Sequence, residues 1–220
     1  MGDMRRLFGL VFCFVVALVA SLALGARLAE AHPHVWVTAT SELLYAPDGS
    51  ITGVRHAWAF DDMFSSYALQ GIETKTKGTY SREDLAPLAQ TNVESLKEYG
   101  FFTFAKADGK KQRFEEPIDY FLDYKDGALI LHFTLPLKNP VKPKQMVLEV
   151  YDRSFFVEFQ MAKENPVKLV GAPAGCQMKL DRPNGGTASA QKLDEQTFLD
   201  GGENSNFGQA FANKITVDCP

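Results

Sequence analysis

The chain has 220 residues, and its 23 lysines and arginines stand against 27 aspartates and glutamates, which gives a formal net charge of −4. This mild negative charge, without any long run of basic residues, gives no support to nucleic-acid binding. Phosphate-binding loops, serine-hydrolase elbows and zinc-protease motifs do not occur in the sequence, so we expect no enzyme activity.

The first 31 residues have the pattern of a secretory signal peptide. A pair of arginines precedes an apolar stretch that runs to Ala26, and an Ala-x-Ala sequence ends at Ala31. Small residues at those positions suit a signal peptidase. Cleavage would leave His32 as the first residue of a single periplasmic β-rich domain, residues 32–220. An uncleaved membrane anchor is the alternative, because the stretch could span a bilayer. No later stretch could do so.

Residues 34–45 and 51–60 alternate between apolar and polar positions and flank a turn sequence, Pro47–Ser50. This pattern predicts a β-hairpin. Matching the apolar faces of the two segments pairs Val37 with Phe60 and Leu43 with Val54.

Residues 61–100 change to helical spacing and predict an inserted helix–loop–helix segment. A first helix is expected over 61–72 and a second over 81–99, which starts with a capping-box pattern in Ser81 and Asp84. The loop between them is similar in length to an EF-hand loop. Lys75 and Lys77 stand where calcium needs oxygen ligands, so we expect a degenerate EF-hand-like loop without calcium. Chance similarity in a polar loop is the alternative.

The rest of the chain reads as short strands separated by turns. Strands are expected at 101–106, 112–114, 118–124, 128–135, 146–151, 155–161, 167–170, 176–180 and 214–219, with a proline-rich connection at 136–143 and a short helix within 203–212. The whole pattern predicts an α+β fold, mainly an antiparallel β-sandwich. Cys176 and Cys219 form an even pair after signal cleavage, which predicts a disulfide in an oxidising compartment.

A free His32 would offer its α-amine and its imidazole to one metal ion, as in the copper sites called histidine braces. His34 could add a second imidazole. A square-planar site built from backbone amides is excluded, because Pro33 has no amide hydrogen. Nitrogen ligands of this kind favour Ni, Co, Zn or Cu.

The hairpin register supplies a carboxylate for this metal site. It places Trp36 opposite Asp61, on the face that His34 shares, so Asp61 is the expected third ligand. Asp62, on the other face, is the second choice. The alternative is that His32 and His34 belong to a frayed, solvated terminus.

Three other polar residues are lesser candidates for a metal or polar site. His56 falls on the apolar face, roughly 23 Å of strand from His34, so it is expected to be a buried, hydrogen-bonded core residue. His132 alternates with apolar neighbours and is expected to point away from the core. Asp152 is an isolated carboxylate near a strand end.

The sequence resembles an exported bacterial family known as domain of unknown function 1007, whose members are often labelled periplasmic components of an ABC-type transport system. The stretches that carry the resemblance are HPHVWV (32–37), RHAWAFDD (55–62), NVESLK (92–97), LHFTLPL (131–137), LEVYD (148–152), GAPAGC (171–176) and SNFG (205–208). The family pattern includes His32, His34, His56, Asp61 and His132. Its frequent acidic loop is replaced here by one with Lys75 and Lys77.

This resemblance implies periplasmic handling of a divalent transition metal beside a nickel/cobalt-type membrane transporter. Together with the residues above, it predicts a periplasmic metal-binding protein that serves such a transporter. A metal-free interaction module of a transport complex is one alternative. A histidine-brace copper enzyme, which would need a reductant and oxygen, is the second.

Overall fold

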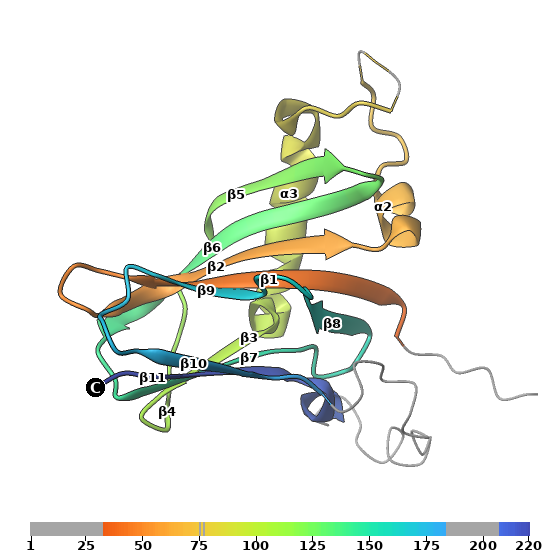
Figure 1. Cartoon of the computed structure of the whole chain (residues 1–220). Helices are drawn as coiled ribbons and strands as arrows, with labels where there is room; N and C mark the ends of the chain where they lie inside the picture. The colour runs from red at the N-terminus through yellow and green to blue at the C-terminus, as the bar shows by residue number, and fades with distance from the viewer. Residues whose placement is uncertain (1–32, 75, 77, 184–206) are drawn as a thin grey trace, which may run out of the picture. The chain divides into compact units, whose positions relative to one another are not determined.

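A computed structural model describes residues 33–74, 76, 78–183 and 207–220, which form two β-sheets with two α-helices beside them (Figure 1). The predicted signal peptide, His32, Lys75, Lys77 and the loop at 184–206 lie outside the described residues. The prediction of an α+β fold with mainly antiparallel sheets is confirmed.

The first sheet contains the predicted hairpin at its centre. Its strand order is β5 (Ile118–Lys125), β6 (Ala128–Val141), β2 (Ile51–Phe60), β1 (Val35–Tyr45) and β8 (Val157–Met161), and β9 (Val167–Val170) also pairs with β1. The antiparallel register sets Val37 opposite Phe60 and Leu43 opposite Val54, as predicted. Both β8 and β9 run parallel to β1, which the sequence pattern did not indicate.

The second sheet has the order β10 (Gln177–Asp181), β11 (Asn213–Asp218), β7 (Gln145–Val150), β3 (Thr103–Ala107) and β4 (Lys110–Lys111). Apolar faces of the two sheets are buried together around Trp58, whose side chain is 1% exposed. The Trp58 ring meets Phe133 and Phe159 edge-on, with ring centroids 4.7 and 4.8 Å apart. Such contacts add to the stabilisation that comes from burial of apolar area.

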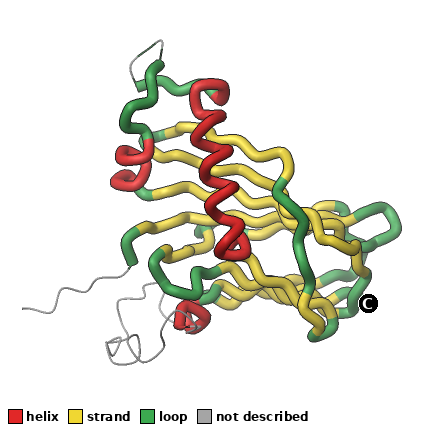
Figure 2. Tube along the Cα trace, turned by 180° about the vertical axis from the view of Figure 1, so that it is seen from behind, coloured by secondary structure: helices red, strands yellow, loops and turns green. Residues whose placement is uncertain are grey.

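Two helices follow the hairpin, as predicted. They are α2 (Asp62–Ala68) and α3 (Arg82–Leu96), and a 3₁₀ segment η1 (Lys97–Phe102) continues α3. Ser81 and Asp84 form the predicted capping box. Figure 2 shows α3 lying across strands of the first sheet, where Leu85, Ala89 and Val93 are buried. Among the described residues, no helix is long and apolar enough to cross a membrane.

The opposite side of the first sheet, here called the open face, comprises Trp36, Thr38, Thr40, Ala57, Ala59, Ile130 and His132. These residues alternate with the buried positions of β1, β2 and β6. Most of them are partly or fully exposed, whereas their neighbours on the core side are buried. One face of the sheet therefore builds the core and the other is available to solvent.

Two strand predictions were wrong. The strand expected at 112–114 is absent, because the strand after the turn, β4, covers Lys110–Lys111. The expected proline-rich connection at 136–143 belongs largely to β6, which continues to Val141. Pro136 lies opposite Gly53 next to an irregularity in the ladder, where a missing amide hydrogen is tolerated. A Cβ atom on Gly53 would lie 2.6 Å from the carbonyl oxygen of Leu135. Glycine thus permits the close approach of β2 and β6 at this bend.

The predicted disulfide between Cys176 and Cys219 is present and links residues 43 positions apart. It fastens the segment before β10 to the residue after β11. A covalent loop of this size stabilises a fold by about 4 kcal/mol in the chain-entropy description. A disulfide is also compatible with a protein that resides outside the cytoplasm.

Asp152, one of the lesser site candidates, is 4% exposed and holds the turn before β8. Its carboxylate accepts hydrogen bonds from the Ser154 amide and hydroxyl and from the Val157 amide. Gly208, in the 3₁₀ segment η4 (Phe207–Phe211), packs against this turn and donates its amide to the Arg153 carbonyl at 2.8 Å. Asp152 therefore has a structural role.

We predict that Gly208→Ala lowers the free energy of unfolding by about 1–3 kcal/mol, because overpacking forces the backbone apart. A Cβ atom there would lie 1.6 Å from the Asp152 carbonyl oxygen. Urea unfolding measures the effect, and Ala210→Ser, at an exposed site in the same segment, is the control. Equal stability of Gly208→Ala and the wild type would contradict this packing.

Candidate functional site

The predicted metal site lies where β1 begins and β2 ends. The Asp61 amide donates to the Trp36 carbonyl at 2.9 Å, so Asp61 and Trp36 are opposite each other, as the register predicted. His34 precedes Trp36 by two residues, and side chains at this spacing share one face of a strand. His34 precedes β1 and Asp61 follows β2, so both residues lie at the end of the sheet where β1 starts.

Asp61 fixes the junction between β2 and α2. Its Oδ2 atom accepts the Trp36 amide at 2.9 Å, and its Oδ1 atom accepts the Phe64 amide at 2.9 Å as the N-cap of α2. Both oxygens thus accept hydrogen bonds from backbone amides. Because a carboxylate oxygen has two lone pairs, this geometry still leaves each one a position for a further donor or a metal.

His34 is exposed and lies against the turn before β8. Its amide donates to the Phe156 carbonyl at 2.9 Å, and its ring packs on the Phe156 ring with centroids 4.7 Å apart. These contacts position the His34 ring beside Phe156. The second-choice ligand, Asp62, is an exposed residue in the first turn of α2.

Glu158 is a carboxylate at this end that the sequence analysis missed. The parallel register of β1 and β8 places it opposite Trp36. Its side chain is 8% exposed and accepts a hydrogen bond from Gln160 at 2.9 Å. Alternation with Val157 and Phe159 could have shown that it faces away from the core, but the pairing with β1 is long-range and leaves no local pattern.

Within the described residues, no three histidine, cysteine, aspartate or glutamate side chains are grouped closely enough to hold a metal ion. His32, which would supply two of the predicted nitrogen ligands, lies outside them. The structure thus brings His34 and Asp61 to one end of the sheet, and their shared face and the completed metal site stay predictions.

His56 is buried between the two sheets, at 1% exposure. Its Nδ1 atom is 2.9 Å from the Ser41 hydroxyl in β1, and its Nε2 atom is 3.3 Å from the Thr103 hydroxyl in β3. The prediction of a hydrogen-bonded core residue is correct. Burial lowers the pKa of His56 to about 3, against a smaller opposing effect of the Thr40 backbone, so the ring is neutral in the folded protein at neutral pH.

This pKa predicts that His56 costs stability as the pH falls. The unfolded chain takes up the proton near pH 6.5, whereas the folded chain resists it down to about pH 3. The unfolded state therefore binds more protons across that window, and stability falls by about 1.4 kcal/mol per pH unit from this group. Above pH 6.5 the His56 ring is neutral in both states, so this group causes no loss of stability there.

The predicted effect of His56 on stability can be measured by urea unfolding at several pH values between 6.5 and 4. The wild type is compared with His56→Gln. Glutamine keeps hydrogen-bonding atoms but has no proton to gain. We expect the wild type to lose more stability than the variant on acidification. Parallel losses in the two proteins would contradict the assignment.

His132 points away from the core, as predicted, and belongs to a network at the sheet edge. Its Nε2 atom is 3.4 Å from Asp123, whose carboxylate accepts two hydrogen bonds from Arg82. Its ring stacks on Phe121 at 4.5 Å, and the Arg82 guanidinium lies 3.7 Å from the centroid of that ring. Burial lowers the pKa of His132, while Asp123 raises it and Arg82 lowers it. The network attaches the start of α3 to β5.

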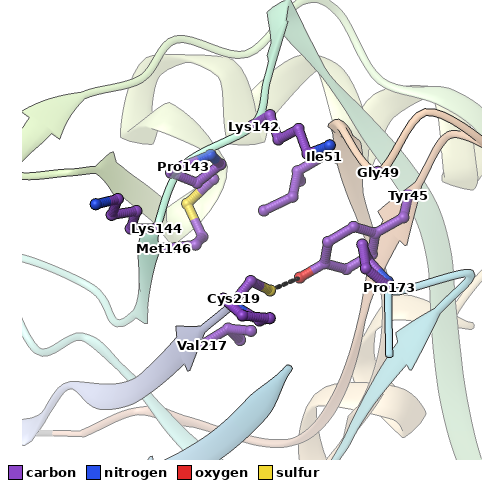
Figure 3. Close-up of a pocket in the computed structure, with 11 residues that line it drawn as sticks. Tyr45, Gly49, Ile51, Lys142, Pro143, Lys144, Met146, Pro173, Val217 and Cys219 are labelled. Atoms are coloured by element: carbon purple, nitrogen blue, oxygen red, sulfur yellow. Dashed lines mark hydrogen bonds between the residues drawn. The ribbon is translucent and has the colours of Figure 1, made fainter. Parts of the chain in front are cut away.

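A cavity of about 260 Å³ lies at the other end of β1, near the turn of the hairpin (Figure 3). Its walls include Ile51, Met146 and Val217, and the Tyr45 hydroxyl faces the Cys219 sulfur at 4.0 Å. Burial raises the pKa of Tyr45. The lining contains no histidine or carboxylate side chain among the described residues, so this cavity does not offer ligands for the predicted metal.

We predict that Asp61→Ala lowers the free energy of unfolding by about 1–2 kcal/mol, because a helix cap and a second backbone hydrogen bond are lost. Asp62→Ala is the matched control, and it removes only a first-turn charge worth about 0.3–1 kcal/mol. Chemical denaturation compares the two. Equal losses would show that the Asp61 hydrogen bonds contribute little.

Comparison with known proteins agrees with the family resemblance seen in the sequence. The sequence model of a family described as "Protein of unknown function (DUF1007)" matches residues 17–219. An uncharacterized protein of Haemophilus influenzae is 25% identical over 195 residues, covering 86% of this chain and 91% of that protein. The match spans nearly the whole chain, and the protein therefore belongs to the DUF1007 family.

Proposed function

We propose that this protein binds a divalent transition metal in the periplasm, at an N-terminus created by signal cleavage, and serves a membrane metal transporter. The observation that supports the proposal best is the register of β1 and β2. It sets Asp61 opposite Trp36, which follows His34 by two residues and the expected first residue, His32, by four.

The ligand chemistry of the proposed site follows from these residues. His32 would contribute an α-amine and an imidazole, His34 an imidazole and Asp61 a carboxylate oxygen. Such a nitrogen-rich set favours Ni, Co, Zn or Cu over Mg or Ca. Exposure of His34 suits a site that passes its metal to another protein, since a fully enclosed metal would exchange slowly.

The proposal is tested on protein purified from the periplasm. Intact mass identifies the first residue, and elemental analysis of the same sample counts the bound metal. We expect a chain that starts at His32 and carries about one equivalent of Ni, Co, Zn or Cu. Loss of a direct ligand should weaken binding at least as much as loss of a supporting one, by about tenfold or more, so we expect that effect from His32→Ala and from His34→Ala.

His132→Ala is the control, because that ring lies in the network with Asp123 and Phe121. It should bind metal as the wild type does. A protein that takes up no metal on titration, or one that retains full affinity after both His32→Ala and His34→Ala, would rule out the proposed site.

A further inference from the structure

Four exposed hydrophobic side chains lie on elements that meet at the end of the first sheet where β1 starts. Trp36 is 41% exposed, Phe156 is 45% exposed, and Met63 and Tyr67 are 66% and 71% exposed. Trp36 is bonded to the N-cap of α2, and Met63 and Tyr67 are one turn apart on that helix. Phe156 reaches the same place through its contact with His34. We call Trp36, Met63, Tyr67 and Phe156 the aromatic end.

Two carboxylates beside the aromatic end reach solvent, since Asp62 is exposed and Asp61 is partly exposed, whereas Glu158 is only 8% exposed. Asp61, Asp62 and Glu158 form no ion pair with a lysine or arginine in the part of the chain that the structure describes. Two other acids of the same sheet are paired with arginines. Glu42 lies 3.0 Å from Arg55, and Asp123 lies 2.8 Å from Arg82.

We propose that the aromatic end is a docking surface for a basic, partly apolar segment of another protein. Lysine and arginine side chains are attracted both to carboxylates and to the faces of aromatic rings, and this end offers the two together. Exposed apolar groups bordered by charge mark interaction sites in soluble proteins. The surface adjoins the proposed metal site, yet it requires no metal.

Two other occupants fit the charges less well. A second copy of the chain, docked through the same surface about a two-fold axis, would bring its own carboxylates against these. An anionic lipid surface would be repelled by Asp61 and Asp62, the two carboxylates there that reach solvent. Among the described residues, the carboxylates without a lysine or arginine partner therefore favour a cationic partner.

The test uses the mature protein without metal and a short peptide of alternating lysine and leucine. The chain has two tryptophans, and Trp58 is 1% exposed, so acrylamide quenching reports mainly on Trp36. We expect the peptide to protect Trp36 from acrylamide and to bind less tightly as salt is added. A peptide with glutamate in place of lysine should give no protection.

Variants locate the binding surface. Trp36→Ala should weaken binding of a labelled lysine–leucine peptide by about tenfold or more, since buried aromatic residues dominate interfaces. Met63→Ala and Asp62→Asn, which alter two exposed residues of α2, should weaken it as well. The matched controls are Met178→Ala and Asp181→Asn, which alter an exposed methionine and a lysine-paired aspartate on β10.

The proposal would be overturned if the lysine peptide did not bind, or if the lysine and glutamate peptides bound equally well. Binding that is unchanged in the Trp36, Met63 and Asp62 variants would overturn it as well. Wild-type dimers that Trp36→Ala converts to monomers would overturn it in favour of a second copy as the occupant. Metal binding is measured separately, so failure of the docking surface and failure of the metal site are distinguishable.

Discussion

The antiparallel register of β1 and β2 is the constraint on which the rest of the molecule depends. Since side chains alternate along a strand, this register decides which residues build the core and which reach the open face. A slip by one residue would exchange the two sets. It would also separate Asp61 from the Trp36 backbone, to which it is bonded in both directions. The core around Trp58 opposes such a slip, because its neighbours would lose their aromatic contacts.

Several residues in the family stretches have structural roles. His56 joins the two sheets through Ser41 and Thr103, and Asp152 ties the turn that Gly208 packs against. Residues of this kind support the scaffold and need no ligand. The functional proposals concern the end of the sheet where β1 starts, because His34 and the residues of the aromatic end are exposed there.

Local patterns predicted the hairpin, both helices and the capping box, because each depends on residues close together in the chain. The Cys176–Cys219 disulfide followed from cysteine count. Local patterns did not predict that β6 continues past Pro136, since the bend depends on Gly53 of another strand. They also missed the parallel pairing of β1 with β8, and with it Glu158. For the site, the sequence predicted that Asp61 lies opposite Trp36, which the structure confirms, while the shared face with His34 and the metal stay predictions.

The most direct test of the account is a two-dimensional amide NMR titration of the mature chain with Ni²⁺, Co²⁺, Zn²⁺ and Cu²⁺. The account predicts that signals broaden or shift first at residues 34–36 and 61–64, with smaller changes at 156–158. Strong changes centred on His132 and Asp123, or no changes with any of these ions, would contradict the claim that metal binds where β1 begins.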